Sequence, residues 1–259
     1  MSLLPALIGL LVGFLVGISG VGGSSLGTPL IILLLRVHPL VAIGTDLAYN
    51  VPTKLLGAYV HCKEGTVDWQ IVLFLALGGV PAMVAGLVVL TILRAYLGLE
   101  YLNAFLKHSI GVLLFIVAVS IVLTPLLLQG RGRAIRDMQE WTTATKRRTV
   151  VLGVLVGFLV GLTSLGSGSI AVPVLYALMP GLTLRRNVGS NVAFAALLIP
   201  AAALGQVGMG NVDAVLVANL LIGSLPGVYL GSKLCAHLPD TILRPALAGM
   251  LVFAGSRLL

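Results

Sequence analysis

Long runs without a charged residue dominate this chain and are separated by short charged segments. Each run reaches or exceeds the roughly 20 residues that cross a hydrocarbon core of about 30 Å. The runs cover residues 1–35, 69–93, 109–130, 149–184 and 187–212. Lipid admits only helices or closed barrels as spanning structures, and the chain lacks the alternating strand-length segments of a barrel. The pattern therefore predicts an all-α polytopic membrane protein.

The hydrophobic pattern occurs twice. The stretch GFLVG at Gly13–Gly17 returns at Gly157–Gly161, an offset of 144 residues, and both copies lead into a Gly/Ser-rich segment that ends in proline. Later echoes follow in the same order: GTD at 44–46 with GSN at 189–191, and G-x-V-D at 65–68 and 210–213. This order predicts two homologous transmembrane repeats, residues 1–129 and 149–259, joined by a basic cytoplasmic linker at 130–148.

Each repeat is expected to contain a broken or re-entrant Gly-rich element followed by three transmembrane helices. The expected elements cover about 2–35, 40–60, 69–93 and 103–128, then about 149–180, 186–207, 212–233 and 241–258. The first element of each repeat is too long for one upright crossing and shorter than the roughly 40 residues that two crossings need. Glycines at 22–23 and 166–168 indicate a break there, which a tilted broken helix or a re-entrant hairpin would satisfy.

Charge bears on the choice between these two shapes. A hairpin that starts at Thr149 returns Arg185 and Arg186 to the cytoplasmic side, and the odd number of crossings would make the two repeats inverted. Arg94 and Lys107 then lie outside, which weakens the argument. Four full crossings would make the repeats parallel, so both arrangements stay open.

Composition agrees with a bilayer location, because 58% of the residues are hydrophobic and only 9% are charged, with a mean hydropathy of +1.11. The net charge of +8 is concentrated in the linker, without a nucleic-acid-binding motif, and fits the positive-inside rule of a bacterial or archaeal cytoplasmic membrane. The N-terminus lacks the features of a removable signal peptide. Two cysteines, no metal pattern and no catalytic or nucleotide-binding motif argue against an enzyme and against a cofactor.

The two Gly/Ser breaks are the first candidate site. Interrupted helices at membrane depth must line a cavity or lie within protein, and half-helix N-termini and hydroxyls, including those of Thr163 and Ser164, suit an anion. The alternative is close helix packing by small residues. The predicted anion cradle consists of Gly22, Gly23, Ser24, Ser25, Gly166, Ser167, Gly168 and Ser169.

The helix expected at 40–60 carries the second candidate group. Asp46, Asn50 and Lys54 are spaced four residues apart and share one helical face. We expect Asn50, Lys54 and Asn191 to line the substrate path, with Lys54 as countercharge and Asp46 as the proton-coupling group. The alternative is that Asp46 caps the helix start and Lys54 extends to the membrane surface.

Taken together, the doubled glycine pattern, with Pro29 and Pro173 and the two G-x-V-D segments, resembles the TauE/SafE family of membrane permeases, often called sulfite exporters. The resemblance implies a two-repeat transporter of small sulfur-containing anions such as sulfite or an organosulfonate, coupled to protons. We therefore expect a secondary transporter whose partners are its anionic substrate and the lipid bilayer. An anion channel, a membrane enzyme, a non-transporting subunit and a homo-oligomeric state remain open alternatives.

Overall fold

The computed structural model describes residues 3–19, 23–128, 141–165, 167–168, 170–179 and 182–234. These residues form helices and contain no strand, so the predicted all-α class is confirmed. The helices are α1 (Leu3–Ser19), α2 (Gly23–Leu35), α3 (Pro39–Lys63), α4 (Trp69–Leu128), α5 (Thr143–Thr163), α6 (Ala171–Leu178), α7 (Leu184–Gly208) and α8 (Ala214–Leu234). Three segments in this part of the chain are long and apolar enough to cross a membrane: Trp69–Ile116, Arg185–Gly208 and Ala214–Leu234.

Helix α4 joins two helices that the sequence separates. The backbone of Gly98 has φ 71° and ψ 164°, outside the helical region, and divides α4 into two arms. These arms correspond to the expected helices at 69–93 and 103–128. The ends of α3, α7 and α8 also fall within a few residues of expectation. The helix expected at 241–258 lies outside the described residues.

The two elements expected at 2–35 and 149–180 are each broken into two helices, as the glycines predict. Helix α1 has 17 residues and α2 has 13, which correspond to about 25 Å and 20 Å of helix. Neither length crosses a hydrocarbon core of about 30 Å alone. In the second element α5 ends at Thr163 and is followed by the C-cap residue Ser164, whose φ of 63° is left-handed, and α6 follows with only eight residues.

The two G-x-V-D segments are helix stop and start signals. Gly65 and Gly210 have φ values of 64° and 71°, a conformation that glycine adopts without the cost of a Cβ atom. The Asp68 Oδ1 then accepts a hydrogen bond from the Gln70 N–H at 3.0 Å, and Asp213 Oδ1 accepts one from the Leu216 N–H at 3.0 Å. Each motif therefore ends one helix and starts the next.

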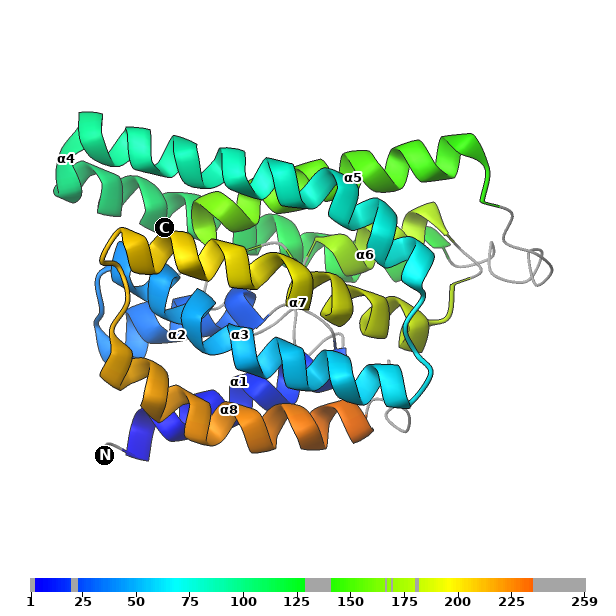
Figure 1. The fold of residues 1–259 in the computed structure, drawn as a ribbon, viewed down its shortest axis with the longest axis horizontal. Coiled ribbons are helices and arrows are strands. Elements are labelled where there is room, and N and C mark those ends of the chain that lie inside the picture. The colour runs from blue at the N-terminus through cyan, green and yellow to red at the C-terminus, as the bar shows by residue number, and fades with distance from the viewer. Residues whose placement is uncertain are drawn as a thin grey trace.

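Two helix pairs form the outer parts of the bundle (Figure 1): α1 lies along α8, and α5 lies along the first arm of α4. A Cβ atom at Gly13 would collide with the backbone of Ser224, and one at Gly157 would collide with the backbone of Gly79. The GFLVG stretch thus serves close helix packing, because small residues let helix backbones approach in membranes.

Helices α3 and α7 pack against each other and run in opposite directions. Gly44, near the start of α3, packs on the backbone of Asn211, which follows α7, and Gly189, near the start of α7, packs on Thr66, which follows α3. Both α3 and α7 also contact the outer helix pairs. Thr53 on α3 is hydrogen-bonded to Ser224 on α8 at 2.8 Å. Helix α7 packs on α4, so α3 and α7 form the interior of the bundle.

Candidate functional site

Helix α3 holds three predicted site residues in the interior. Asp46, Asn50 and Lys54 have exposed fractions of 0%, 0% and 1%. The helix begins at Pro39 after His38, which makes no side-chain cap, so Asp46 lies about two turns inside and does not cap the helix start. The burial of Lys54 likewise excludes the alternative in which its ammonium reaches the membrane surface. Both charged side chains face protein.

The Asp46 carboxylate connects three elements. The Ser164 hydroxyl donates to Asp46 Oδ2 at 2.8 Å, and the Ser164 Oγ lies 3.1 Å from the Thr28 Oγ1. Gly27 lies against the Asp46 carboxylate and the Tyr49 hydroxyl, and a Cβ atom there would collide with both. Since Thr28 lies on α2 and Ser164 is the C-cap of α5, the two broken elements meet at this carboxylate. We refer to Thr28, Asp46 and Ser164 as the hydroxyl–carboxylate cluster.

Lys54 is a charged side chain buried in the interior of the bundle. Its Nζ is buried and has no hydrogen-bond partner among the described residues. The ion pair found in that same part, Arg185 with Glu64 at 3.3 Å, is exposed and does not involve Lys54. An ammonium group removed from water without a partner costs several kcal/mol. A bound anion would offset that cost.

Two asparagine amides flank the same region. The Asn50 Nδ2 donates to the Asp46 carbonyl at 2.9 Å, and the Asn191 Nδ2 donates to the Asn187 Oδ1 at 3.0 Å. The Oδ1 atoms of Asn50 and Asn191 find no hydrogen-bond partner within the described ranges. A Cβ atom on Gly57 of α3 would lie 3.1 Å from a methyl carbon of Val192 on α7. Lys54 and Asn191 are therefore within one turn of the same helix contact.

The residues of the predicted cradle are only partly described. Gly23, Ser24 and Ser25 form the first turn of α2, directly after the first break. Gly22, Gly166 and Ser169 lie outside the described residues, as do the side chains of Ser24 and Ser25. At the second break the Gly168 carbonyl accepts from the Val172 N–H at 3.1 Å, which starts α6. A half-helix N-terminus thus follows each break.

The hydroxyls at the second break differ in what they contact. Ser167 is 1% exposed, and its Oγ has no hydrogen-bond partner in the described part of the chain. Thr163 donates to the Leu159 carbonyl at 2.8 Å, and Ser164 is engaged by Asp46. Of the hydroxyls expected to serve an anion, Ser167 is therefore the one that the structure leaves available among these three.

The sequence reasoning missed Thr28 and Asn187. Thr28 lies one turn beyond Ser24 and Ser25, so the helical spacing of these hydroxyls was the available signal. Asn187 precedes Asn191 by four residues, and its Nδ2 donates to the Val172 carbonyl at 2.8 Å, which ties α7 to α6. The same spacing of four residues links Asp46 with Asn50 on α3.

Helices that can span a membrane, two broken elements and buried polar groups between them define a polytopic helical membrane protein with an internal polar site. Sequence comparison identifies its family. Residues 5–258 match the profile described as sulfite exporter TauE/SafE, so the chain belongs to the TauE/SafE family.

Three relatives illustrate the match. The chain is 38% identical over 260 residues to the probable membrane transporter protein YjnA of Bacillus subtilis strain 168, with 100% of both chains covered. It is 30% identical to the probable membrane transporter protein YdhB of the same organism, over 96% of this chain and 99% of the relative. A probable membrane transporter protein of Haemophilus influenzae is 28% identical over 76% of this chain and 70% of its own. No solved structure matches.

The family and the relatives' names together indicate an integral membrane transporter and not an enzyme.

Proposed function

We propose that the chain is a proton-coupled secondary transporter of a small anion, with sulfite or an organosulfonate as substrate. The observation that carries the proposal is the Lys54 ammonium, buried without a hydrogen-bond partner among the described residues. Buried charges at membrane depth are costly and mark substrate or ion pathways. A substrate of charge −1 or −2 would neutralise Lys54 while bound.

The substrate would bind between Lys54 and the two half-helix N-termini. Free backbone N–H groups at a helix start carry partial positive charge, and Ser167 adds a hydroxyl donor. The two unpartnered asparagine oxygens would accept from protonated substrate oxygens or from Lys54 itself. Sulfite and sulfonates present three oxygens on one sulfur, and the family description names sulfite. This chemistry supports a small tetrahedral or pyramidal oxyanion as substrate.

Asp46 is the group that would couple transport to protons. As a carboxylate it accepts from Ser164 at 2.8 Å and so joins the end of α5 to α3. A hydrogen bond to a charged group contributes about 1.5–3 kcal/mol, against about 0.5–1.5 kcal/mol for a neutral one. Protonation of Asp46 would weaken the Ser164–Asp46 hydrogen bond by about 1 kcal/mol. The contact between the two broken elements would then be weaker. Proton binding and movement at the substrate site would then be linked.

We further infer that the two repeats are inverted, in a bacterial or archaeal cytoplasmic membrane with the basic linker inside. Matching contacts support this arrangement. Thr45 Oγ1 accepts from the Asp213 N–H at 3.0 Å, and Ser190 Oγ accepts from the Asp68 N–H at 2.8 Å. The antiparallel course of α3 and α7 is what an inverted pair of equivalent helices would produce.

Transport by purified protein in liposomes tests the proposal. Liposomes loaded with sulfite, sulfoacetate or sulfate would be given an inward or outward pH gradient, and anion flux would be followed with time. We expect the pH gradient to drive flux of at least one of the sulfur oxyanions. Lys54→Gln should reduce that flux at least tenfold. Lys63→Gln is the matched control, since Lys63 is an exposed lysine at the end of the same helix.

Two results would contradict the proposal. One is sulfur-oxyanion flux in Lys54→Gln equal to that of the unaltered protein. The other is the absence of flux for each anion under either gradient, with the protein shown to be folded in the liposomes. Currents far above the turnover of a carrier would instead favour an anion channel with the same pathway.

A further inference from the structure

An apolar groove lies between α5 and α6, at the end of α5 far from Ser164. Its volume is about 650 Å³. Its lining includes two arginines and apolar side chains from both helices: Arg147, Arg148, Val151 and Leu155 of α5, with Val174 and Leu178 of α6. Arg147, Val151 and Leu155 are spaced four residues apart and share one face of α5, and Arg148 lies beside that face, three residues before Val151. None of the groove residues is acidic.

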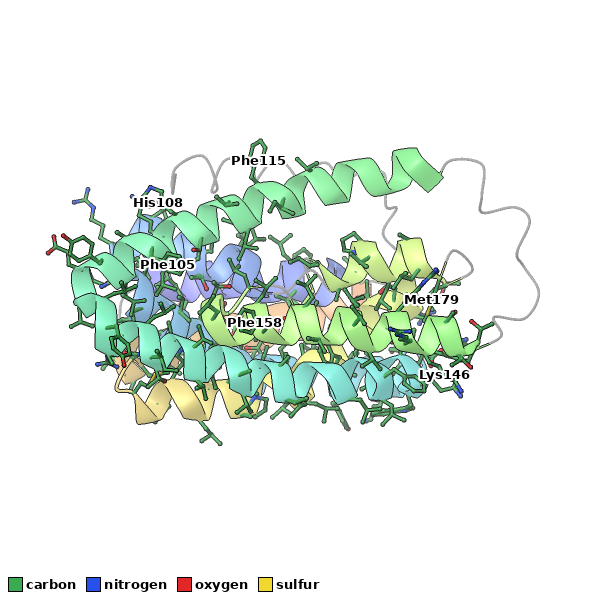
Figure 2. The ribbon with its side chains drawn as sticks, turned by 90° about the horizontal axis from the view of Figure 1, so that it is seen from above. Phe105, His108, Phe115, Lys146, Phe158 and Met179 are labelled. Atoms are coloured by element: carbon green, nitrogen blue, oxygen red, sulfur yellow. The ribbon has the colours of Figure 1, made fainter. Side chains whose placement is uncertain are left out.

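The start of α5 has the features of a membrane interface. Trp141 packs on Phe74 with ring centroids 5.4 Å apart, and the Lys146 Nζ lies 5.7 Å from the centre of the Phe74 ring. Figure 2 shows Lys146 at this end of α5 and Met179, just beyond α6, at the same end of the molecule. Aromatic and basic residues gather at the level of the lipid headgroups. The mouth of the groove is therefore at headgroup depth.

Arg147 and Arg148 remain available at that mouth. Lys146 beside them is engaged by Phe74, whereas both arginines are exposed and form no ion pair within the described ranges. A guanidinium binds phosphate oxygens with two parallel hydrogen bonds, and basic pockets between transmembrane helices on the cytoplasmic side recognise lipid headgroups. The two charges therefore favour a phosphate ligand.

The apolar lining of the groove is long enough to contact an acyl chain. From Arg148 to Leu155 the helix descends seven residues, or about 10 Å, within a leaflet that is half of the roughly 30 Å hydrocarbon core. The volume lies inside the range of about 300–1,000 Å³ that is usual for ligand pockets. We propose that this groove binds one anionic phospholipid, with its phosphate on Arg147 and Arg148 and an acyl chain along α5 and α6.

Lipid binding by the full chain in detergent tests this site independently of transport. Native mass spectrometry would count bound lipids, and thermal unfolding would report stabilisation, with phosphatidylglycerol or the zwitterionic phosphatidylcholine added at equal concentration. We expect one tightly bound phosphatidylglycerol and a preference over phosphatidylcholine. The double variant Arg147→Gln/Arg148→Gln should bind it at least tenfold more weakly. Arg185→Gln/Arg186→Gln removes the same charge from another exposed site and serves as the control.

A second variant separates groove binding from surface charge. Val151→Trp fills the groove at an exposed position and leaves both arginines in place, so it should also release the lipid. Equal binding of the two lipids, an equal loss in the control, or full binding by Val151→Trp would each overturn the proposal. Glycerol 1-phosphate that stabilises the protein as much as phosphatidylglycerol would also overturn it, because the site would then bind a headgroup anion without a chain.

Discussion

Replacing Lys54 by methionine tests the central electrostatic argument. Methionine is unbranched, one heavy atom shorter than lysine and uncharged, so the substitution removes the buried ammonium and leaves most of the side-chain volume. Replacing buried ion pairs by apolar side chains is often neutral or raises stability by about 1–4 kcal/mol, and the Lys54 ammonium has no hydrogen bond or ion pair to lose among the described residues. Without substrate, we therefore expect Lys54→Met to be more stable than the unaltered protein by about that amount. Thermal unfolding of purified protein in detergent measures the difference.

The same experiment with substrate should stabilise the unaltered protein but not Lys54→Met. A ligand at 100 times its dissociation constant stabilises the folded state by about 2.7 kcal/mol. The unaltered protein should show this gain with sulfite or the transported sulfonate, and Lys54→Met should show none. Lys63→Met, which changes an exposed lysine over the Tyr59 ring, should retain the substrate response. A destabilised Lys54→Met, or one with the full substrate response, would refute the reasoning.

Three further variants test other parts of the structure. Asp46→Asn should leave anion binding measurable in thermal shift but remove the dependence of liposome flux on the pH gradient; unchanged coupling would exclude Asp46. Ser164→Gly keeps the left-handed backbone and deletes the hydroxyl, so it should weaken proton coupling without unfolding the protein, and flux with a normal pH response would contradict the cluster's role. Gly157→Ala should destabilise by about 1–3 kcal/mol, because the added Cβ collides with Gly79. Gly208→Ala, which meets nothing within 4 Å, should not, and equal melting of the two would refute the packing argument.

The helices could be predicted because each is encoded locally. Runs of apolar residues set their lengths, and glycines at Gly65 and Gly210 together with capping carboxylates set their ends. The sequence analysis did not place the division of α4 to the residue, although Gly98 is the one glycine between Arg94 and Lys107 and has the positive φ that glycine favours.

The shared face of the buried polar residues on α3 was predictable for the same reason. The helical spacing placed Asp46, Asn50 and Lys54 on one face, and burial of all three agrees with that face pointing inward. The partners of Asp46 could not be predicted, because Ser164 lies 118 residues away in the chain. Only the packing of α5 against α4, and of α3 against α7, brings that hydroxyl to the carboxylate.

The contacts of Asp46 differ from the contacts that hold the bundle together. Packing contacts occur in matching pairs: Gly44 on Asn211 matches Gly189 on Thr66. Among the described residues the hydroxyl–carboxylate cluster has no such match, since the position equivalent to Asp46 is Asn191, whose amide bonds within its own helix. On the proposed mechanism, a scaffold of paired contacts would move between two equivalent arrangements. The Asp46 carboxylate and the Lys54 ammonium, whose charges the equivalent positions Asn191 and Ile199 do not repeat, would favour one of them according to whether proton and anion are bound. Because Asp46 and Lys54 share α3, that helix is where binding energy would be converted into movement.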